Sequence, residues 1–463
     1  MCYGLCMMRQ SRLKSFFKMT PSKYILISFA AIILTGAFLL CLPFSNVDGN
    51  WLPFIDGLFT STSAVCVTGL GVFDVAVKFT LFGQIVVLLL IQLGGLGFVT
   101  IASFLFLLVG KKINYSTRMA LQESLNQENN QGIVKTMQKV LIITFLCEFI
   151  GFLMLAPSMI SFAGDFGSGV FKALFLAVSA FCNAGFDPFG TLTPEFSNLM
   201  PMANNALVLI PTMLLIVFGG IGFIVILDVC RKHRNQKKMM LHTRVVLWMT
   251  GILIFLGAGL FMILEWNNPN TIGNMCVGDK ILNAFFQSVT TRSAGFTTID
   301  QSALSPVSHI ISGFLMFVGG SPVSIAGGIK TTTLFVLLLM LFKNTDNNGN
   351  IIYKSKKIKN SLLSKAVRIT LIAVMLVVIS TISIHLFEGG KFTIGAILYE
   401  TISSVCTVGL SFGITPLLSV PSKLILVLLM YTGRIGMLTI PLAFKTKDNI
   451  AEIEYVEAKI TVG

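Results

Sequence analysis

Long apolar runs alternate with polar connections along the whole chain. Each of eight runs is long enough to cross a bilayer as a helix. They are Tyr24–Leu42, Leu81–Val109, Val140–Phe162, Ala206–Cys230, Val245–Leu264, Ile310–Leu341, Val367–Leu386 and Leu424–Phe444. The pattern predicts an all-α integral membrane protein with eight spanning helices.

A shorter apolar segment lies between the two runs of each successive pair. These segments are Phe54–Val65, Val170–Phe181, Ile281–Thr291 and Thr393–Val405. They are too short to cross the hydrocarbon, so we expect four re-entrant helices. Irregular backbone at membrane depth is tolerated only where protein buries it or water reaches it. The pattern therefore predicts four repeats, each a spanning helix, a pore helix and a second spanning helix, around a central ion pore.

Composition and charge fit this interpretation. The chain of 463 residues is 54% hydrophobic and 12% charged, which excludes a disordered chain and a soluble domain of ordinary composition. Its net charge of +14 would also fit nucleic-acid binding. However, most Lys and Arg fall on one side of the predicted topology, at Arg9–Lys23, Lys111–Lys139, Arg231–Arg244, Lys343–Arg368 and Lys445–Lys459. The positive-inside rule explains this excess, predicts that both termini are cytoplasmic, and argues against nucleic acid as a partner.

A Gly-containing segment follows each short helix and recurs four times in register. The copies are SAVCVTGL from Ser63, SAFCNAGF from Ser179, VTTRSAGF from Val289 and SSVCTVGL from Ser403. They recur at intervals of roughly 110 residues. We therefore divide the chain into 1–23 (cytoplasmic N-terminal segment), 24–109 (repeat 1), 110–231 (cytoplasmic loop and repeat 2), 232–343 (repeat 3), 344–445 (cytoplasmic loop and repeat 4) and 446–463 (cytoplasmic tail).

These Gly segments are the candidate ion-binding elements. A pore that selects a dehydrated cation must replace its water with oxygen dipoles, and backbone carbonyls do so without fixed charge. Gly permits the backbone angles that turn carbonyls inward, and the short helices would point their partly negative C-terminal ends at the ion. The predicted carbonyl donors are Val67, Thr68, Gly69, Asn183, Ala184, Gly185, Ser293, Ala294, Gly295, Thr407, Val408 and Gly409.

The second runs also contain related small-residue motifs. They read GGLG from Gly94, GGIG from Gly219, GGSP from Gly319 and GRIG from Gly433. Alone, such motifs indicate close helix packing, and their recurrence favours packing around a shared axis. The third motif opens a stretch, 319–330, whose Pro, four Gly and Lys cannot remain a regular helix.

At these residues the chain resembles the Trk/Ktr/HKT potassium transporters. The segments TSTSAVCVTGL, AFCNAGFD, SVTTRSAGFTTID and SSVCTVGLSFGITP are similar to that family's four filter loops. Eight spans make the chain most similar to the bacterial Ktr-type membrane subunit. The resemblance implies potassium uptake across the cell membrane, linked to sodium, with K⁺ and Na⁺ as transported or coupling ions and no cofactor bound by this chain. It also implies a homodimer with one pore per protomer and a cytosolic ring of nucleotide-binding regulatory subunits.

The resemblance further implies a gate below the filter at 319–330. Its expected gating residues are Gly319, Gly320, Ser321, Gly327, Gly328, Lys330 and Arg434. The family usually has a small residue in place of Val323 and Thr in place of Ile325, so both positions add bulk here. A buried Arg in the last span is costly unless paired, which favours contact between Arg434 and this loop over a snorkelling role. Lys330 fits either the vestibule or the interface.

Several single residues have two interpretations. Arg292 takes the position of a Cys in the other three copies and would either tune ion occupancy or, as we favour, pair structurally with Glu400. Asp74, Asp187 and Asp300 follow their filters and would either concentrate cations at the mouth or cap loops. Glu148 would either relay protons or, as we favour, hydrogen-bond to a neighbouring helix.

Two other classes of function fit the sequence less well. A secondary transporter for another cation or a small solute usually has inverted repeats, whereas these repeats share one orientation. An intramembrane enzyme needs a paired acid, a metal cluster or a nucleophile with its base, and the spans contain none of these patterns. We therefore expect a non-enzymatic ion transporter.

Overall fold

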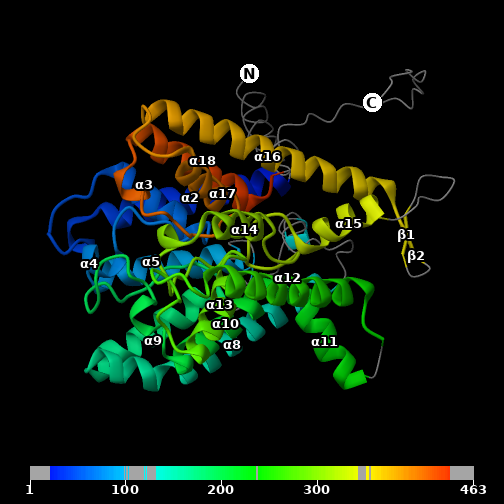
Figure 1. The fold of residues 1–463 in the computed structure, drawn as a ribbon, viewed down its shortest axis with the longest axis horizontal. Coiled ribbons are helices and arrows are strands. Elements are labelled where there is room, and N and C mark those ends of the chain that lie inside the picture. Colours follow the sequence, from blue (N-terminus) through cyan, green and yellow to red (C-terminus); the bar gives the residue numbers. More distant parts are fainter. Residues whose placement is uncertain are drawn as a thin grey trace, which may run out of the picture.

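The computed structural model describes residues 21–97, 100, 103, 119, 121–122, 132–235, 238–342, 351–353 and 356–437. Most of the predicted N-terminal segment, most of the loop before repeat 2, part of the loop before repeat 4 and the C-terminal tail lie outside these residues. So do the inner ends of the predicted runs Leu81–Val109 and Leu424–Phe444. The described chain is overwhelmingly helical (Figure 1).

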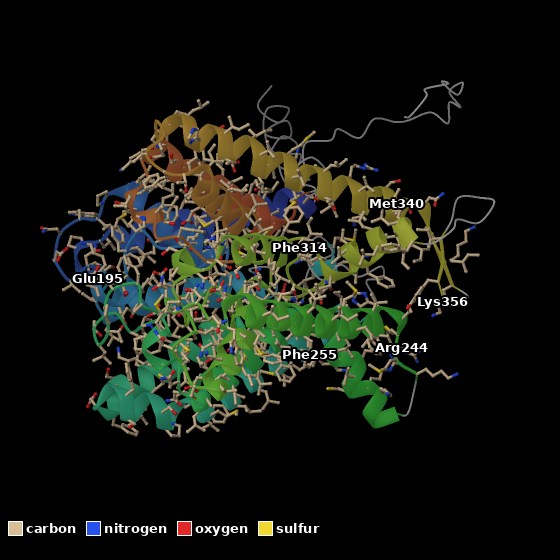
Figure 2. All side chains as sticks on the ribbon, in the orientation of Figure 1. Glu195, Arg244, Phe255, Phe314, Met340 and Lys356 are labelled. Carbon is tan, nitrogen blue, oxygen red and sulfur yellow. The ribbon has the colours of Figure 1, made fainter. Side chains whose placement is uncertain are left out.

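The first helix of each repeat is long and unbroken, as predicted. These helices are α2 (Pro21–Cys41), α8 (Ile133–Ala163), α12 (Leu241–Glu265) and α16 (Asn360–Phe387), and each is long and apolar enough to cross a membrane. Their outer faces expose large apolar side chains such as Phe255, which is 69% exposed (Figure 2). Such surfaces are stable in lipid rather than in water, so the chain is a multi-pass membrane protein.

The two ends of the molecule differ in charge. Figure 2 places Glu195 at one end of the long axis and Arg244 and Lys356 toward the other. This separation matches the distribution of Lys and Arg in the sequence.

The four predicted short helices are all present. They are α3 (Phe54–Val65), α9 (Phe166–Phe181), α13 (Val277–Thr290) and α17 (Ile394–Val405). α9 and α13 begin about one turn earlier than the apolar pattern suggested. In α9 the extra turn is capped, because the Asp165 carboxylate accepts a hydrogen bond from the Ser168 N–H at 2.8 Å.

The second helix of each repeat ends early. These helices are α5 (Leu81–Leu96), α10 (Ala206–Ile221), α14 (Pro306–Phe317) and α18 (Val420–Ile435). Three of them stop at a glycine of positive φ, namely Gly97 (80°), Gly222 (98°) and Gly436 (103°). After Gly222 the chain bends by 95° into α11 (Phe223–Asn235). The prediction of one continuous helix over Ala206–Cys230 is therefore wrong.

In repeat 3 an irregular loop separates α14 from α15 (Thr331–Phe342), as the composition of 319–330 predicted. The remaining elements are small. They are η1 (Pro43–Ser45), α4 (Val75–Lys78), η2 (Met200–Met202), η3 (Gln301–Ala303), η4 (Thr415–Leu417) and strands β1 (Ile351–Tyr353) and β2 (Lys356–Ile358). The strands form an antiparallel hairpin with Ile351 opposite Ile358. This hairpin, in the predicted loop before repeat 4, is a departure from the all-α expectation.

The repeats pack in a closed cycle. The second helix of each repeat contacts the short helix of the next, in the pairs α5–α9, α10–α13, α14–α17 and α18–α3. The last pair joins the end of the chain to its beginning. There the Lys423 ammonium lies 2.9 Å from the Asp56 carboxylate, with both side chains largely buried.

We expect Asp56→Asn to weaken this closure, because it leaves Lys423 buried without its counter-charge. The loss should be about 3 kcal/mol of unfolding free energy. Asp48→Asn is the matched control, because the Lys78–Asp48 pair is more exposed and such pairs contribute little. The measurement is thermal unfolding of both purified variants in detergent. Equal melting temperatures would contradict the structural role of the buried pair.

Candidate cation filter and gating loop

The four predicted filter glycines form a closed ring. There is no room for a Cβ at any of them, because it would lie within 2.9 Å of a carbonyl oxygen in the neighbouring repeat. The contacts run from Gly69 to Ala184, Gly185 to Ala294, Gly295 to Val408 and Gly409 to Thr68. Segments more than 100 residues apart in sequence therefore meet in one ring, in chain order.

The backbone of each filter segment repeats one unusual conformation. The glycines have φ between 71° and 93°. The residues two positions earlier are also left-handed although they are not glycine, namely Val67 (56°), Asn183 (55°), Ser293 (70°) and Thr407 (47°). A left-handed conformation costs a non-glycine residue about 1–2 kcal/mol, so the surrounding contacts must hold it in place. Alternation of handedness along a segment turns successive carbonyls toward the same side.

Hydroxyl groups of the short helices hold these segments. Ser63 and Ser403 accept hydrogen bonds from the Gly69 and Gly409 N–H groups at 3.1 and 3.0 Å. Ser179 and Thr290 instead donate to the carbonyls of Phe186 and Phe296 at 2.7 and 2.6 Å. Sequence analysis missed this role. The signal was present, because Ser opens three of the four Gly segments.

The small-residue motifs of the second helices also contact the filter region. A Cβ at Gly94, Gly219 or Gly433 would collide with the carbonyl of Val65, Phe181 or Val405 respectively. Each of these carbonyls belongs to the last residue of the short helix in the same repeat. The motifs thus permit close packing, as expected, and the packing partner is the end of the short helix.

The loop 319–330 lies directly against the filter. The Ser293 hydroxyl donates to the Thr407 carbonyl at 2.7 Å and accepts from the Gly327 N–H at 2.9 Å. A Cβ on Gly327 would lie 2.5 Å from the Cys406 carbonyl oxygen. One side chain therefore joins the third filter segment, the fourth filter segment and the loop.

The broken helix α10 holds the loop from a second side. Because α10 ends at Ile221, the carbonyls of Gly219 and Gly220 lack their helical partners. The Ile325 and Ser321 N–H groups donate to them at 3.2 and 2.9 Å. In return, the Phe223 N–H donates to the Val323 carbonyl at 3.1 Å. Val323 has φ +58°, a strained value for a β-branched residue.

Arg434 holds the loop from a third side. Its guanidinium donates to the Ile325 carbonyl and to the carbonyls of Gly94 and Gly95 at the end of α5. The predicted contact between Arg434 and the loop is therefore present. Lys330 donates to the Ala326 carbonyl within the loop at 2.6 Å.

The other predicted gating residues belong to the same assembly. Gly319 packs on Gly327 and Gly328, and the Gly320 carbonyl accepts from the Thr331 N–H at 3.0 Å. The Ser321 hydroxyl lies 3.1 Å from that of Thr331.

Two of the single-residue interpretations are decided by geometry. Glu400 accepts hydrogen bonds from Ser411, the Phe412 N–H and Thr415, and Arg292 is absent from these contacts. The suggested Arg292–Glu400 pair is therefore wrong. Glu148 accepts a hydrogen bond from Gln92 of α5 at 3.2 Å, as favoured.

An outer vestibule of about 830 Å³ opens above the ring. Its lining includes all four filter glycines and the carboxylates Asp74, Asp187, Glu195 and Asp300, and no Lys or Arg lines it among the described residues. The three aspartates also cap loops, since Asp74, Asp187 and Asp300 accept from the N–H groups of Ala76, Phe189 and Ser302. Burial raises the pKa of Asp187 to about 7, and the charge of Asp74 adds to the rise.

The five lysines that lie in the segments opposite the basic loops are not in the vestibule lining. Lys78 and Lys423 pair with aspartates. Lys172, Lys280 and Lys391 donate to the carbonyls of Pro188, Trp266 and Leu417. The vestibule is therefore lined by carboxylates, and the charge of Lys172 acts on two of them, Asp187 and Asp74.

Comparison with known proteins agrees with this geometry. The TrkH family, described as "Cation transport protein", matches residues 8–453. The chain is 35% identical to the Ktr system potassium uptake protein B of Bacillus subtilis, over 98% of this chain and 100% of that protein. It is 36% identical to the potassium/sodium uptake protein NtpJ of Enterococcus hirae, over 96% of this chain and 98% of that one.

A solved structure shares the fold. The potassium transporter TrkH from Vibrio parahaemolyticus superposes with a TM-score of 0.67 over 93% of this chain and 86% of that one, at 14% identity. With a family match over nearly its whole length and full-length relatives above 30% identity, this chain belongs to the TrkH family of cation transport proteins.

Proposed function

We propose that this protein takes up potassium ions through the ring formed by its four filter segments. The observation that carries the proposal is the ring itself, in which Gly69, Gly185, Gly295 and Gly409 meet with the same left-handed backbone. Four segments of one conformation around an axis supply successive rings of carbonyl oxygens, which suit a dehydrated alkali cation. Relatives named as potassium uptake proteins support potassium as that cation.

In this proposal the ion is held by backbone oxygens of the twelve predicted residues. The short helices all end at the filter, so their C-terminal dipoles would add favourable potential.

The proposed arrangement in the membrane keeps eight spans, four re-entrant helices and the repeat boundaries given above. Each second helix, with the segment that follows its break, would form one span. Both termini would be cytoplasmic in the cell membrane, which is supported by the basic inner loops of the sequence.

The proposed partners follow from the relatives. The name "Ktr system" supports a regulatory subunit, which we propose is a cytosolic nucleotide-binding ring, and the functional unit would be a homodimer. The name of the potassium/sodium uptake protein supports sodium linkage.

We further propose that 319–330 is the gate. The loop is held from three sides, by Ser293, by the freed carbonyls of α10 and by Arg434. Its release would need only a few hydrogen bonds to break, which suits an element with two alternative arrangements.

Potassium uptake is tested by complementation of a bacterium that cannot grow at low potassium, with and without sodium. We expect the wild-type chain to restore growth. Gly69→Ser should raise the potassium concentration required for growth at least tenfold, because a side chain there strikes the Ala184 carbonyl. Gly49→Ser is the control, since Gly49 also has positive φ but open space around it. No growth with wild-type protein present in the membrane would contradict the proposal.

The outer vestibule should make uptake depend on external pH. Asp187 is charged above its pKa of about 7 and neutral below it, so apparent potassium affinity should fall as external pH drops from about 8 to 6. In Asp187→Asn the affinity should be low at both pH values. Rubidium uptake curves measure this, with Asp165→Asn, outside the vestibule lining, as the control. An unchanged curve in Asp187→Asn would exclude the role.

Arg434→Gln tests the gate. Its loss frees the carbonyls of Ile325, Gly94 and Gly95, so the loop should open more often and maximal uptake should rise several-fold with selectivity unaltered. Arg231→Gln removes the same charge from an exposed position and should have no effect. A lower maximal rate at equal membrane abundance would count against a gate held shut by Arg434.

A further inference from the structure

Arg292 carries a buried charge without a counter-charge. Its side chain is 7% exposed, and its Nε has no hydrogen-bond partner among the described residues. The ion pairs in the described part of the chain are Lys78–Asp48 and Lys423–Asp56, so Arg292 belongs to neither. A buried guanidinium without a counter-charge destabilises the fold, so its presence here suggests a functional role.

The position of Arg292 in the repeat places it behind the filter. The equivalent residues are Cys66, Cys182 and Cys406. Cys182 and Cys406 both face the second helix of the preceding repeat. Cys182 lies against Gly95 of α5, and Cys406 contacts the Phe317 carbonyl of α14. Arg292 likewise lines a cavity with Gly220 of α10. Only the third repeat therefore brings a charge to this position.

A small cavity lies beside Arg292. Its walls come from α10, α12, the end of α13 and the loop 319–330, and its volume is about 10 Å³, close to the least that one water molecule needs. The other polar side chain in its lining is Thr250, whose hydroxyl also has no hydrogen-bond partner among the described residues. The lining contains no acidic residue, so it supplies no counter-charge to Arg292.

This charge acts on the filter at short range. Arg292 precedes Ser293 in the chain, so its guanidinium lies within roughly 10 Å of the third filter segment. An ion held by that segment lies a few ångströms further away. At an effective dielectric constant of about 20, a unit charge at roughly 10–15 Å changes the binding constant of a monovalent cation several-fold to about tenfold. Arg434 differs, because its guanidinium is surrounded by three carbonyl oxygens.

We propose that Arg292 sets the affinity of the filter, because its unpaired charge weakens potassium binding at the inner end of the ring and so speeds ion release into the cell. Conduction requires binding that is weak enough for the ion to leave. The inference rests on the proposed uptake function and adds the residue that sets its affinity.

The test compares four variants in rubidium uptake by proteoliposomes. Arg292→Met removes the charge, and both apparent KM and maximal rate should fall about three- to tenfold. Arg292→Lys keeps the charge and should resemble the wild type. Thr250→Val changes the cavity without changing charge and should also resemble the wild type. Thr250→Asp supplies a counter-charge with Arg292 still present and should lower KM as Arg292→Met does.

The outcomes separate this inference from the proposed function. A purely structural role predicts less folded protein with unchanged KM, so unchanged KM in Arg292→Met would overturn the inference. So would a KM that falls equally in Arg292→Lys or in Thr250→Val. If Arg292→Met does not fold, unchanged KM in Thr250→Asp decides against it. Failure of the wild-type protein to take up rubidium or potassium would refute the uptake function instead.

Discussion

The structure depends on one constraint, that backbone polar groups inside a membrane must find partners within the protein. Three of the second helices stop at glycines of positive φ, and each stop leaves carbonyls without helical donors. For α5 and α10, distant segments of the chain supply the missing donors. N–H groups of the loop 319–330 take the carbonyls of Gly219 and Gly220, and Arg434 takes those of Gly94 and Gly95. The breaks thus create the acceptors that position the loop, and the loop in turn fixes helices from three repeats.

The same constraint explains why glycines form the ring and why hydroxyl groups of the short helices hold it in place. Each filter glycine lies against a carbonyl of the next repeat, so a side chain at one position would displace two repeats. The left-handed residues before the glycines store strain of about 1–2 kcal/mol each. Hydroxyls from the short helices, such as Ser63 and Thr290, hold this backbone without adding charge beside the proposed ion pathway. Rigidity at the filter therefore comes from local hydrogen bonds, while closure of the ring comes from packing between repeats.

Sequence patterns predicted the elements better than their breaks. Apolar periodicity located the long first helices and the short helices, and recurrence of the Gly segments located the ring. Apolar periodicity could not reveal that α10 ends at Ile221, because Gly222 lies within an unbroken apolar run. The close approach of the Pro322 carbonyl, which leaves no room for a Cβ at Gly222, appears only in the fold. The Arg292–Glu400 pairing was wrong for a similar reason. Two opposite charges in a sequence do not show how far apart the side chains lie. In the fold, the hydroxyls of Ser411 and Thr415 donate to Glu400 instead.

Repeat 3 combines two departures from the other repeats, and they are physically connected. It has Arg292 in place of Cys, and an irregular loop where repeat 2 continues directly into the helix α11. Ser293 bonds to both the loop and the fourth filter segment, while Arg292 and Gly320 of the loop line one cavity. Movement of the loop would therefore alter a hydrogen bond to the filter and the surroundings of a buried charge together. The proposed filter and the proposed gate, joined in this way, cannot change independently, so opening of the loop should itself change how tightly the ring holds its ion.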